Sequence, residues 1–199
     1  MNSYLVFDFE TTGLKPPTDR IIQVGLCEVR DGSVVSTDRW LVRQDVPIAA
    51  DARAVHGITP QDLQARGIPP HESLTRLLGV LNQAPACMGH NIHMFDVLFL
   101  TAEARRLGMT PPRVDDFVDT AALFKGWKLR IAKGPNDTHR RYAERVLSMK
   151  TPGLKYSIQT CLAELRIDRN AAMAHDAAGD AYLTHLIYGK LMSLPGGLR

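Results

Sequence analysis

The chain has 199 residues, of which 45% are hydrophobic, and its formal net charge is only +3. These values predict a globular domain that buries a core, and they exclude a polyelectrolyte chain, so any nucleic-acid surface must be local. The three cysteines have no CxxC spacing, no signal-peptide pattern opens the chain, and no apolar run reaches the roughly 20 residues that span a bilayer. We therefore expect reduced thiols in a cytoplasmic protein.

The hydrophobic pattern predicts three consecutive strands first, at residues 4–10, 20–30 and 33–43, with a hairpin turn at Asp31-Gly32. The remainder alternates helices with short strands. The predicted helices cover residues 51–55, 60–66, 72–81, 95–107, 120–124, 154–165 and 176–191, and the short strands cover 86–88 and 113–119. This order predicts an α/β domain with a mixed sheet, led by three antiparallel strands and spanning residues 1–194. A short flexible tail is expected at 195–199.

The first predicted strand, YLVFDFETTG, carries two acids on one face. Alternation places Leu5, Phe7 and Phe9 on one side and Asp8 and Glu10 on the other. Two unit charges about 4 Å apart repel by roughly 4 kcal/mol at an effective dielectric near 20. Exposure to water, protonation of one acid, or bound cations would each relieve this repulsion.

Two later stretches add acids in apolar surroundings. GHNIHMFDVLFL places Asp96 at the first turn of a helix, where a carboxylate is also favoured simply by the helix dipole. AHDAAGDAYLTHLIYGKL places His175 five residues before Asp180, among small residues that permit close approach. A histidine before an alanine-rich helix is commonly a cap or loop residue, and Asp176 fits the role of helix cap.

Taken together, Asp8, Glu10, Asp96 and Asp180 indicate oxygen-only ligation of hard cations such as Mg²⁺ or Mn²⁺. Two such ions can activate a water and stabilise the leaving oxygen of a phosphodiester. His175, with an ordinary pKa near 6.5, suits the role of general base at neutral pH. Bound cations would thus relieve the repulsion on the first strand.

DFETTG, HN…FD and the final HxxxxD, in this order, resemble the three motifs of the DEDDh exonuclease superfamily. That superfamily includes RNase T, oligoribonuclease, the epsilon subunit of bacterial DNA polymerase III and the three-prime repair exonucleases. The resemblance implies an RNase-H-like fold and 3′→5′ hydrolysis that releases nucleoside 5′-monophosphates. It assigns the two metal ions to Asp8, Glu10, Asp96 and Asp180, and the general base to His175. One departure is that Asn91 and Asp96 lie five residues apart, where many members have four.

The resemblance also implies a set of substrate contacts, at Phe9, Thr11, Thr12, Gly13, Leu14, His56, Asn91 and Phe95. For Thr-Thr-Gly the alternative is an ordinary turn that ends a strand. For His56, in AVHGIT, the alternative is a packed loop histidine. Asp119, in VDTAALF, fits both support of the metal ligands and a helix cap.

A basic insert at about residues 125–153 interrupts the regular alternation. Its candidate nucleic-acid contacts are Lys125, Lys128, Arg130, Arg140 and Arg141, close in sequence to the aromatic residues Trp127 and Tyr142. Such a stretch suits a surface that tracks phosphates and stacks bases, and the alternative is a solvated basic helix. Gly134-Pro135-Asn136-Asp137 predicts a mobile loop tip within it.

The sequence therefore predicts a metal-dependent 3′→5′ exonuclease that acts on single-stranded ends, with DNA favoured over RNA by likeness to the proofreading and repair branch. An RNA-trimming exoribonuclease or oligoribonuclease is the alternative among enzymes. A non-catalytic nucleic-acid-binding or polymerase-accessory domain is the alternative of another class. The expected partners are single-stranded 3′ ends, without a membrane. A homodimer and a polymerase or repair complex both stay open.

Overall fold

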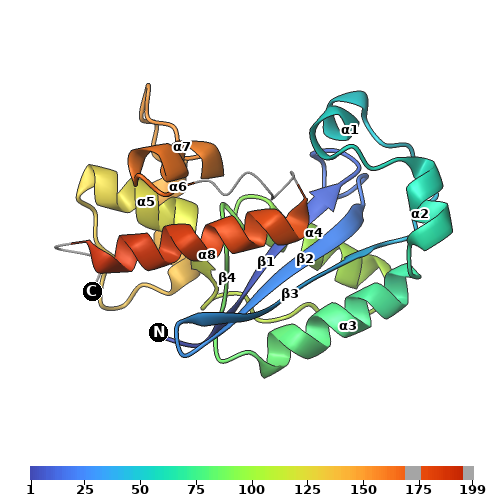
Figure 1. The fold of residues 1–199 in the computed structure, drawn as a ribbon, viewed down its shortest axis with the longest axis horizontal. Helices are drawn as coiled ribbons and strands as arrows, with labels where there is room; N and C mark the ends of the chain where they lie inside the picture. The colour runs from blue at the N-terminus through green and yellow to red at the C-terminus, as the bar shows by residue number, and fades with distance from the viewer. Residues whose placement is uncertain (169–175, 195–199) are drawn as a thin grey trace.

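In a computed structural model, residues 1–168 and 176–194 are described, and they form a five-stranded mixed sheet flanked by helices (Figure 1). The strands are β1 (Tyr4–Thr11), β2 (Ile21–Arg30), β3 (Ser33–Leu41), β4 (Cys87–Gly89) and β5 (Val118–Asp119), in the spatial order β3-β2-β1-β4-β5. The first three strands are antiparallel, and β4 and β5 continue the sheet parallel to β1. The helices are α1 (Ala50–His56), α2 (Pro60–Arg66), α3 (Pro70–Gln83), α4 (Asp96–Arg106), α5 (Thr120–Leu129), α6 (His139–Ser148), α7 (Ile158–Glu164) and α8 (Ala177–Ser193). This arrangement confirms the predicted α/β class with three leading antiparallel strands.

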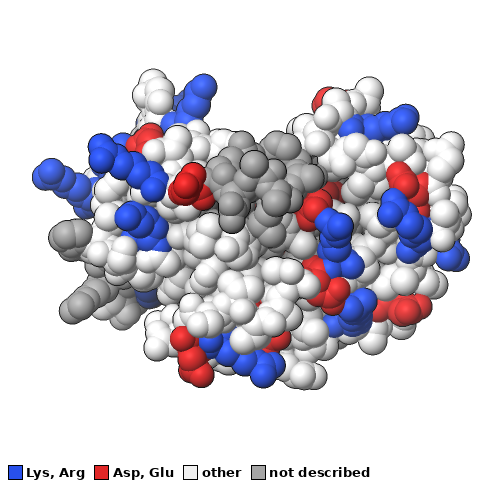
Figure 2. Space-filling model, in the orientation of Figure 1, with Lys and Arg blue, Asp and Glu red and all other residues white. Residues whose placement is uncertain are grey.

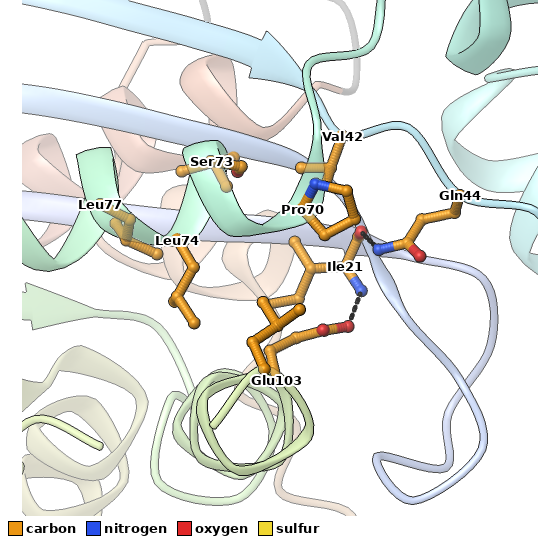
Figure 3. Close-up of a pocket in the computed structure, with 10 residues that line it drawn as sticks. Ile21, Val42, Gln44, Pro70, Ser73, Leu74, Leu77 and Glu103 are labelled. Carbon is orange, nitrogen blue, oxygen red and sulfur yellow. Dashed lines mark hydrogen bonds between the residues drawn. The ribbon is translucent and has the colours of Figure 1, made fainter. Parts of the chain in front are cut away.

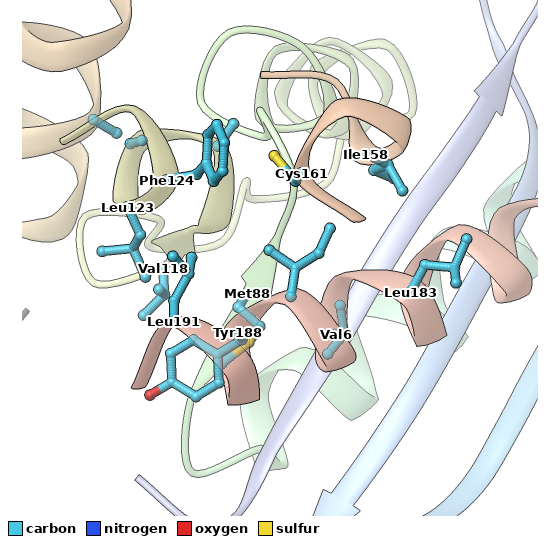
Figure 4. Packing of buried hydrophobic residues seen from close by; sticks show 14 of the residues in the cluster. Val6, Met88, Val118, Leu123, Phe124, Ile158, Cys161, Leu183, Tyr188 and Leu191 are labelled. Carbon is cyan, nitrogen blue, oxygen red and sulfur yellow. The ribbon is translucent and has the colours of Figure 1, made fainter. Parts of the chain in front are cut away.

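Helices cover both faces of the sheet, as the alternation on β1 requires. Val6 packs under α8, together with residues of α5, α6 and α7 (Figure 4). Phe7 and Phe9 point to the opposite face, where α3 and α4 complete a second cluster. In Figure 1, α8 crosses the strands on one face, and α1 and α2 lie beyond the end of β1. The face of Asp8 and Glu10 is therefore the face that α8 covers.

Most predicted elements are present with shifted ends, but one predicted strand is much shorter, and one helix lies where no bounded element was predicted. The strand expected at 113–119 is reduced to Val118–Asp119 because its neighbour β4 spans only three residues and pairs only through Met88 and Gly89. The basic insert contains a helix, α6, whose bounds were not predicted, although a basic helix was the alternative interpretation of this stretch. Its apolar side buries Tyr142, Ala143, Val146 and Leu147, while the arginines around them hide this pattern in the sequence.

Glu103 anchors α4 to the start of β2. Figure 3 shows its carboxylate accepting a hydrogen bond, 3.3 Å long, from the backbone N–H of Ile21 at the rim of a mostly apolar pocket. Arg106 pairs with Glu103 at 2.7 Å and donates to the carbonyl of Pro16 at 3.1 Å. This pocket lies on the sheet face opposite Asp8 and Glu10. Glu103 therefore ties α4 to the start of β2, and Arg106 ties it to the loop after β1.

Among the described residues, no helix combines the length and the apolarity that crossing a bilayer requires.

Candidate metal centre

Three carboxylates converge where β1 ends under α8. Asp8 and Glu10 belong to β1, and Asp180 lies in the first turn of α8. One oxygen from each lies within 4.8 Å of the other two, and all three side chains are partly buried. The structure thus brings together three of the four acids that the sequence assigned to a metal site.

The start of α8 is held by its cap. Asp176 accepts a hydrogen bond from the backbone N–H of Gly179 at 2.9 Å, which confirms its predicted role as helix cap. Arg39 of β3 forms an ion pair with the same side chain. Asp180 donates its backbone N–H to the carbonyl of Asp176 at 3.0 Å, so its position follows from that of the cap.

Asp96, the fourth acid, is the first residue of α4 and is only 3% exposed. It accepts a hydrogen bond from the backbone N–H of Phe9 at 3.1 Å. The pairing of β1 with β4 involves Leu5 and Val6, so the Phe9 amide lies beyond the β1–β4 ladder and takes Asp96 as its acceptor. Asp96 supplies that acceptor from a position beside the backbone that joins Asp8 to Glu10.

Asp119 organises the loop that leads to Asp96. Its carboxylate caps α5 by accepting from two backbone N–H groups, and it also accepts from the N–H of Asn91 at 2.9 Å and of His93 at 3.1 Å. Asn91 has a left-handed φ of 60°, a conformation that asparagine tolerates better than most residues. Asp119 is therefore both a helix cap and a support for the segment before a candidate metal ligand.

Burial and mutual repulsion perturb these acids. Burial raises the pKa of Asp8 well above its usual range, and the neighbouring Asp96, Asp180 and Glu10 raise it further. Burial, followed by repulsion from Asp180 and Asp176, raises the pKa of Glu10 to about 7. The pKa of Asp96 is also raised well above its usual range, mainly by burial. Clustered carboxylates of this kind fit hard divalent cations, whose charge would remove the repulsion.

The raised pKa values predict how the stability of the metal-free protein depends on pH. The pKa of Glu10 is about 7 in the folded chain against an ordinary value of 4.5, so the folded state binds its proton more tightly. The free energy of unfolding should therefore fall as pH rises through this interval. Thermal unfolding after removal of metals checks this, and Glu10→Gln should flatten the profile. A variant profile identical to that of the wild type would contradict the prediction.

The segment after β1 is tightly hydrogen-bonded. Thr11 donates its hydroxyl to the carbonyl of Gly13 at 2.6 Å, and Thr12 donates to Asp19 at 3.3 Å. Thr11, Thr12 and Gly13 are buried, whereas Leu14 is 73% exposed. The two threonine side chains thus build the turn, and Leu14 is the one residue of the stretch from Thr11 to Leu14 whose side chain is exposed.

The other predicted substrate contacts have different surroundings. Phe9 is 4% exposed and its ring packs on Phe7, because alternation along β1 turns the ring into the core; its contact with the substrate stays a prediction. His56 is partly buried, its Nδ1 accepts from the N–H of Ile58 at 3.0 Å, and burial lowers its pKa. Asn91 and Phe95 are partly exposed beside Asp96. His175 lies outside the described residues.

One member of the predicted basic surface is wrong. Lys125 is 1% exposed, and its Nζ donates to the carbonyls of Leu147 and Met149 at 3.1 and 2.7 Å. These carbonyls belong to the C-terminal end of α6, whose dipole favours a cation. Lys125 is therefore an internal support for α6.

The remaining members of the set are exposed, but several are paired with acids. Lys128 pairs with Glu164 at 2.5 Å, and Arg140 pairs with Glu144 at 2.8 Å. Arg130 and Arg141 form no ion pair within the described ranges. On the face drawn in Figure 2, acidic and basic side chains are interspersed over the described residues.

Sequence reasoning did not identify Gln23 as part of this region. Gln23 lies opposite Glu10 in the β1–β2 ladder, and its side-chain oxygen accepts from the backbone N–H of Ala177 at 3.0 Å. It is 7% exposed. A polar residue in the middle of the apolar run IIQVGLCEV was the only signal in the sequence, and that signal does not reveal its partner.

The comparison with protein families gives one match over most of the chain. A family model described as an exonuclease, RNase_T, matches residues 5–188. The PolC-type DNA polymerase III of Thermotoga petrophila is 34% identical over 125 residues, which cover 62% of this chain and 9% of the polymerase. Its counterpart in Thermotoga maritima is 33% identical over 125 residues, with the same coverage. The chain thus spans a small part of the length of these relatives.

Solved structures show the same fold. E. coli Exonuclease I in complex with a dT13 oligonucleotide has a TM-score of 0.74 at 20% identity, and the match covers 96% of this chain and 41% of that chain. The zinc-ion-bound form of the E. coli ExoI–ssDNA complex has a TM-score of 0.75 at 20% identity and covers 97% and 41%. These matches confirm the predicted RNase-H-like architecture.

Proposed function

The chain belongs to the exonuclease family, and on that premise we propose that it hydrolyses single-stranded DNA from the 3′ end and releases nucleoside 5′-monophosphates. The observation that carries this proposal is the convergence of Asp8, Glu10 and Asp180 within 4.8 Å, with Asp96 bonded to the backbone between the first two. We further propose that the catalytic domain spans residues 1–194 and works in the cytoplasm, which is consistent with its free cysteines.

We propose that the four acids hold two divalent cations, Mg²⁺ or Mn²⁺. Oxygen ligands drawn from a strand and two helices suit these ions, which keep the remaining positions for water and phosphate oxygens. Cations bound there would supply an activated water and charge stabilisation of the leaving 3′ oxygen. Asp96 is held by its hydrogen bond from Phe9, next in the chain to both Asp8 and Glu10, and we propose that its carboxylate completes the ligand set when cations bind.

The protein's own groups then have distinct roles. We assign proton removal from the attacking water to His175, because a neutral imidazole accepts a proton at physiological pH. We propose that Leu14, which is exposed directly after the hydrogen-bonded turn of Thr11, Thr12 and Gly13, packs its apolar side chain against the terminal nucleotide. His56 lies on the neighbouring α1, whose start is tied to this turn by a bond from Ala49 to the carbonyl of Thr12 at 2.8 Å.

DNA is the proposed substrate because the relatives and neighbours point to it. The two polymerases are DNA polymerases, and the Exonuclease I structures contain single-stranded DNA. Incubation of the protein with Mg²⁺ and matched oligonucleotides of single-stranded DNA, duplex DNA and RNA tests this choice. Single-stranded DNA should be shortened fastest, and mass spectrometry should detect 5′-monophosphates. Faster degradation of RNA, or products with a 3′-phosphate, would contradict the proposal.

Arg141 is the sharpest test of the proposed nucleic-acid surface on the basic insert. It is exposed on α6, and it has no acidic partner in the described part of the chain. Arg141→Glu should weaken the binding of single-stranded DNA and reduce the slope of log affinity against log salt by about 1. Fluorescence anisotropy at several salt concentrations measures both.

Arg30→Glu is the control for a charge reversal at a distant surface, because Arg30 is exposed at the far end of β2, where it pairs with Glu28 at 2.6 Å. Binding and salt slope should be unchanged in that variant. If Arg141→Glu has the same slope as the wild type, the basic insert is only a solvated surface.

A further inference from the structure

The strand next to the candidate ligands, β2, contacts the first turn of α8 through Gln23 and Gly25. Gly25 and Gln23 lie directly opposite Asp8 and Glu10 in the ladder, on the same face of the sheet. We propose that Gly25 and Gln23 are positioning residues. They hold the first turn of α8 at the distance from β1 at which Asp180 can bind the same cation as Asp8 and Glu10. This inference rests on the proposed metal-dependent function and adds two residues that position its metal ligands.

Gly25 is required by space and not by conformation. Its backbone has no left-handed φ, so other residues can adopt its dihedral angles. A Cβ at this position would lie 2.0 Å from the carbonyl carbon of Ala177 and 2.2 Å from the backbone nitrogen of Ala178. Those atoms belong to a helix backbone and cannot rotate away as a side chain can. A methyl group here must therefore separate α8 from the sheet by about 1 Å or more.

When a methyl group is added at Gly25, we expect α8 to move and β2 to stay in place. β2 is hydrogen-bonded along its length to β1 on one side and to β3 on the other, whereas α8 rests on the sheet through side chains and its first turn. Asp180 belongs to that turn and is bonded to Asp176 within it. An outward shift of the turn therefore carries Asp180 away from Asp8 and Glu10.

Gln23 holds the same turn by attraction. Its Oε1 accepts from the N–H of Ala177 at 3.0 Å, and this amide lies in the first turn, whose N–H groups have no partner within the helix. Gly25 thus allows the close approach, and Gln23 fixes it with a hydrogen bond. Gly25 and Gln23 belong to β2, which pairs with β1. The register of this pairing therefore places Gly25 opposite Asp8 and Gln23 opposite Glu10.

Mn²⁺ titration of the metal-free protein by calorimetry tests the positioning role of Gly25 and Gln23 without relying on catalysis. Gly25→Ala should lower the Mn²⁺ affinity by about tenfold or more, because residues that orient metal ligands typically have effects of this size. Binding of single-stranded DNA in EDTA should stay within about twofold of the wild type. Gly189→Ala is the matched control: it lies on the same helix, a Cβ added there would meet nothing within 4 Å, and its affinity should not change.

Gln23→Met supplies a second variant that keeps the size of the side chain and removes the acceptor. Gln23→Met should also lower the Mn²⁺ affinity. If Gly25→Ala fails to fold, the Mn²⁺ affinity of Gln23→Met alone tests the positioning role. If Gly25→Ala folds and binds Mn²⁺ as tightly as the wild type, the inference is wrong. If Gly25→Ala does not fold, the same affinity in Gln23→Met would overturn it. If the wild-type chain binds Mn²⁺ but cleaves no nucleic acid, the proposed function is refuted. The positioning role of Gly25 and Gln23 then still depends on the Mn²⁺ affinities of the variants. A wild-type chain that binds no Mn²⁺ would overturn both.

Discussion

Asp8→Asn is expected to lower the rate of phosphodiester hydrolysis by about a thousandfold or more, while the metal-free protein becomes more stable. A ligand lost from a catalytic cation site removes several kcal/mol of stabilisation of the transition state. The same change removes a carboxyl group whose pKa is raised by burial and by Asp96, Asp180 and Glu10. Without cations, that removal should raise the free energy of unfolding at pH 7 by about 1–3 kcal/mol.

Initial rates on single-stranded DNA and chemical denaturation in EDTA measure the two effects on the same preparations. Asp38→Asn is the matched control, because Asp38 is an acid on β3 that pairs with Arg76 and lies outside the carboxylate cluster. Its rate should match that of the wild type. A rate within about tenfold of the wild type in Asp8→Asn would show that Asp8 holds no catalytic ion.

His175→Ala is expected to have the second largest effect. A general base contributes about a hundredfold to ten-thousandfold, so the turnover rate should fall by that amount. Because the proposed role is to accept a proton and not to hold a cation, the Mn²⁺ affinity should stay close to that of the wild type. The acidic limb of the pH–rate profile should also change in the variant, since the group that must be neutral is missing.

Asp180→Asn provides the contrast, because this change removes a proposed ligand five residues away. It should lower both the rate and the Mn²⁺ affinity. If His175→Ala loses as much Mn²⁺ affinity as Asp180→Asn, His175 is a ligand or a structural residue and its assignment as the base is wrong.

The acids of the candidate site could be predicted from the sequence because each lies in a short local pattern. The alternation around Asp8 and Glu10 determines the face on which they lie, and the structure places both under α8 with Asp180. The leading strands were equally visible, because period-two alternation and the Asp31-Gly32 turn are local signals. Asp176 as the cap of α8 follows from the same kind of local chemistry.

Other features depend on contacts between distant segments, which leave no local pattern. Gly25 meets Ala177 across more than 150 residues of chain, and nothing in IIQVGLCEV identifies its neighbour. Lys125 is one of several basic residues in its stretch, and only the position of α6 shows that it is internal. The hydrophobic side of α6 was hidden because arginines surround Tyr142 and Val146 in the sequence.

We propose that the carboxylates at the end of β1 form a metal-dependent centre for 3′→5′ hydrolysis. The most direct measurement is a time course on 5′-labelled single-stranded DNA, with Mg²⁺ or with EDTA, for the wild type and for Asp8→Asn. We expect a ladder that shortens by one nucleotide at a time from the 3′ end in the wild type with Mg²⁺, and intact DNA in the other three reactions. Immediate release of the label as a mononucleotide, or an equal ladder in EDTA or in Asp8→Asn, would contradict it.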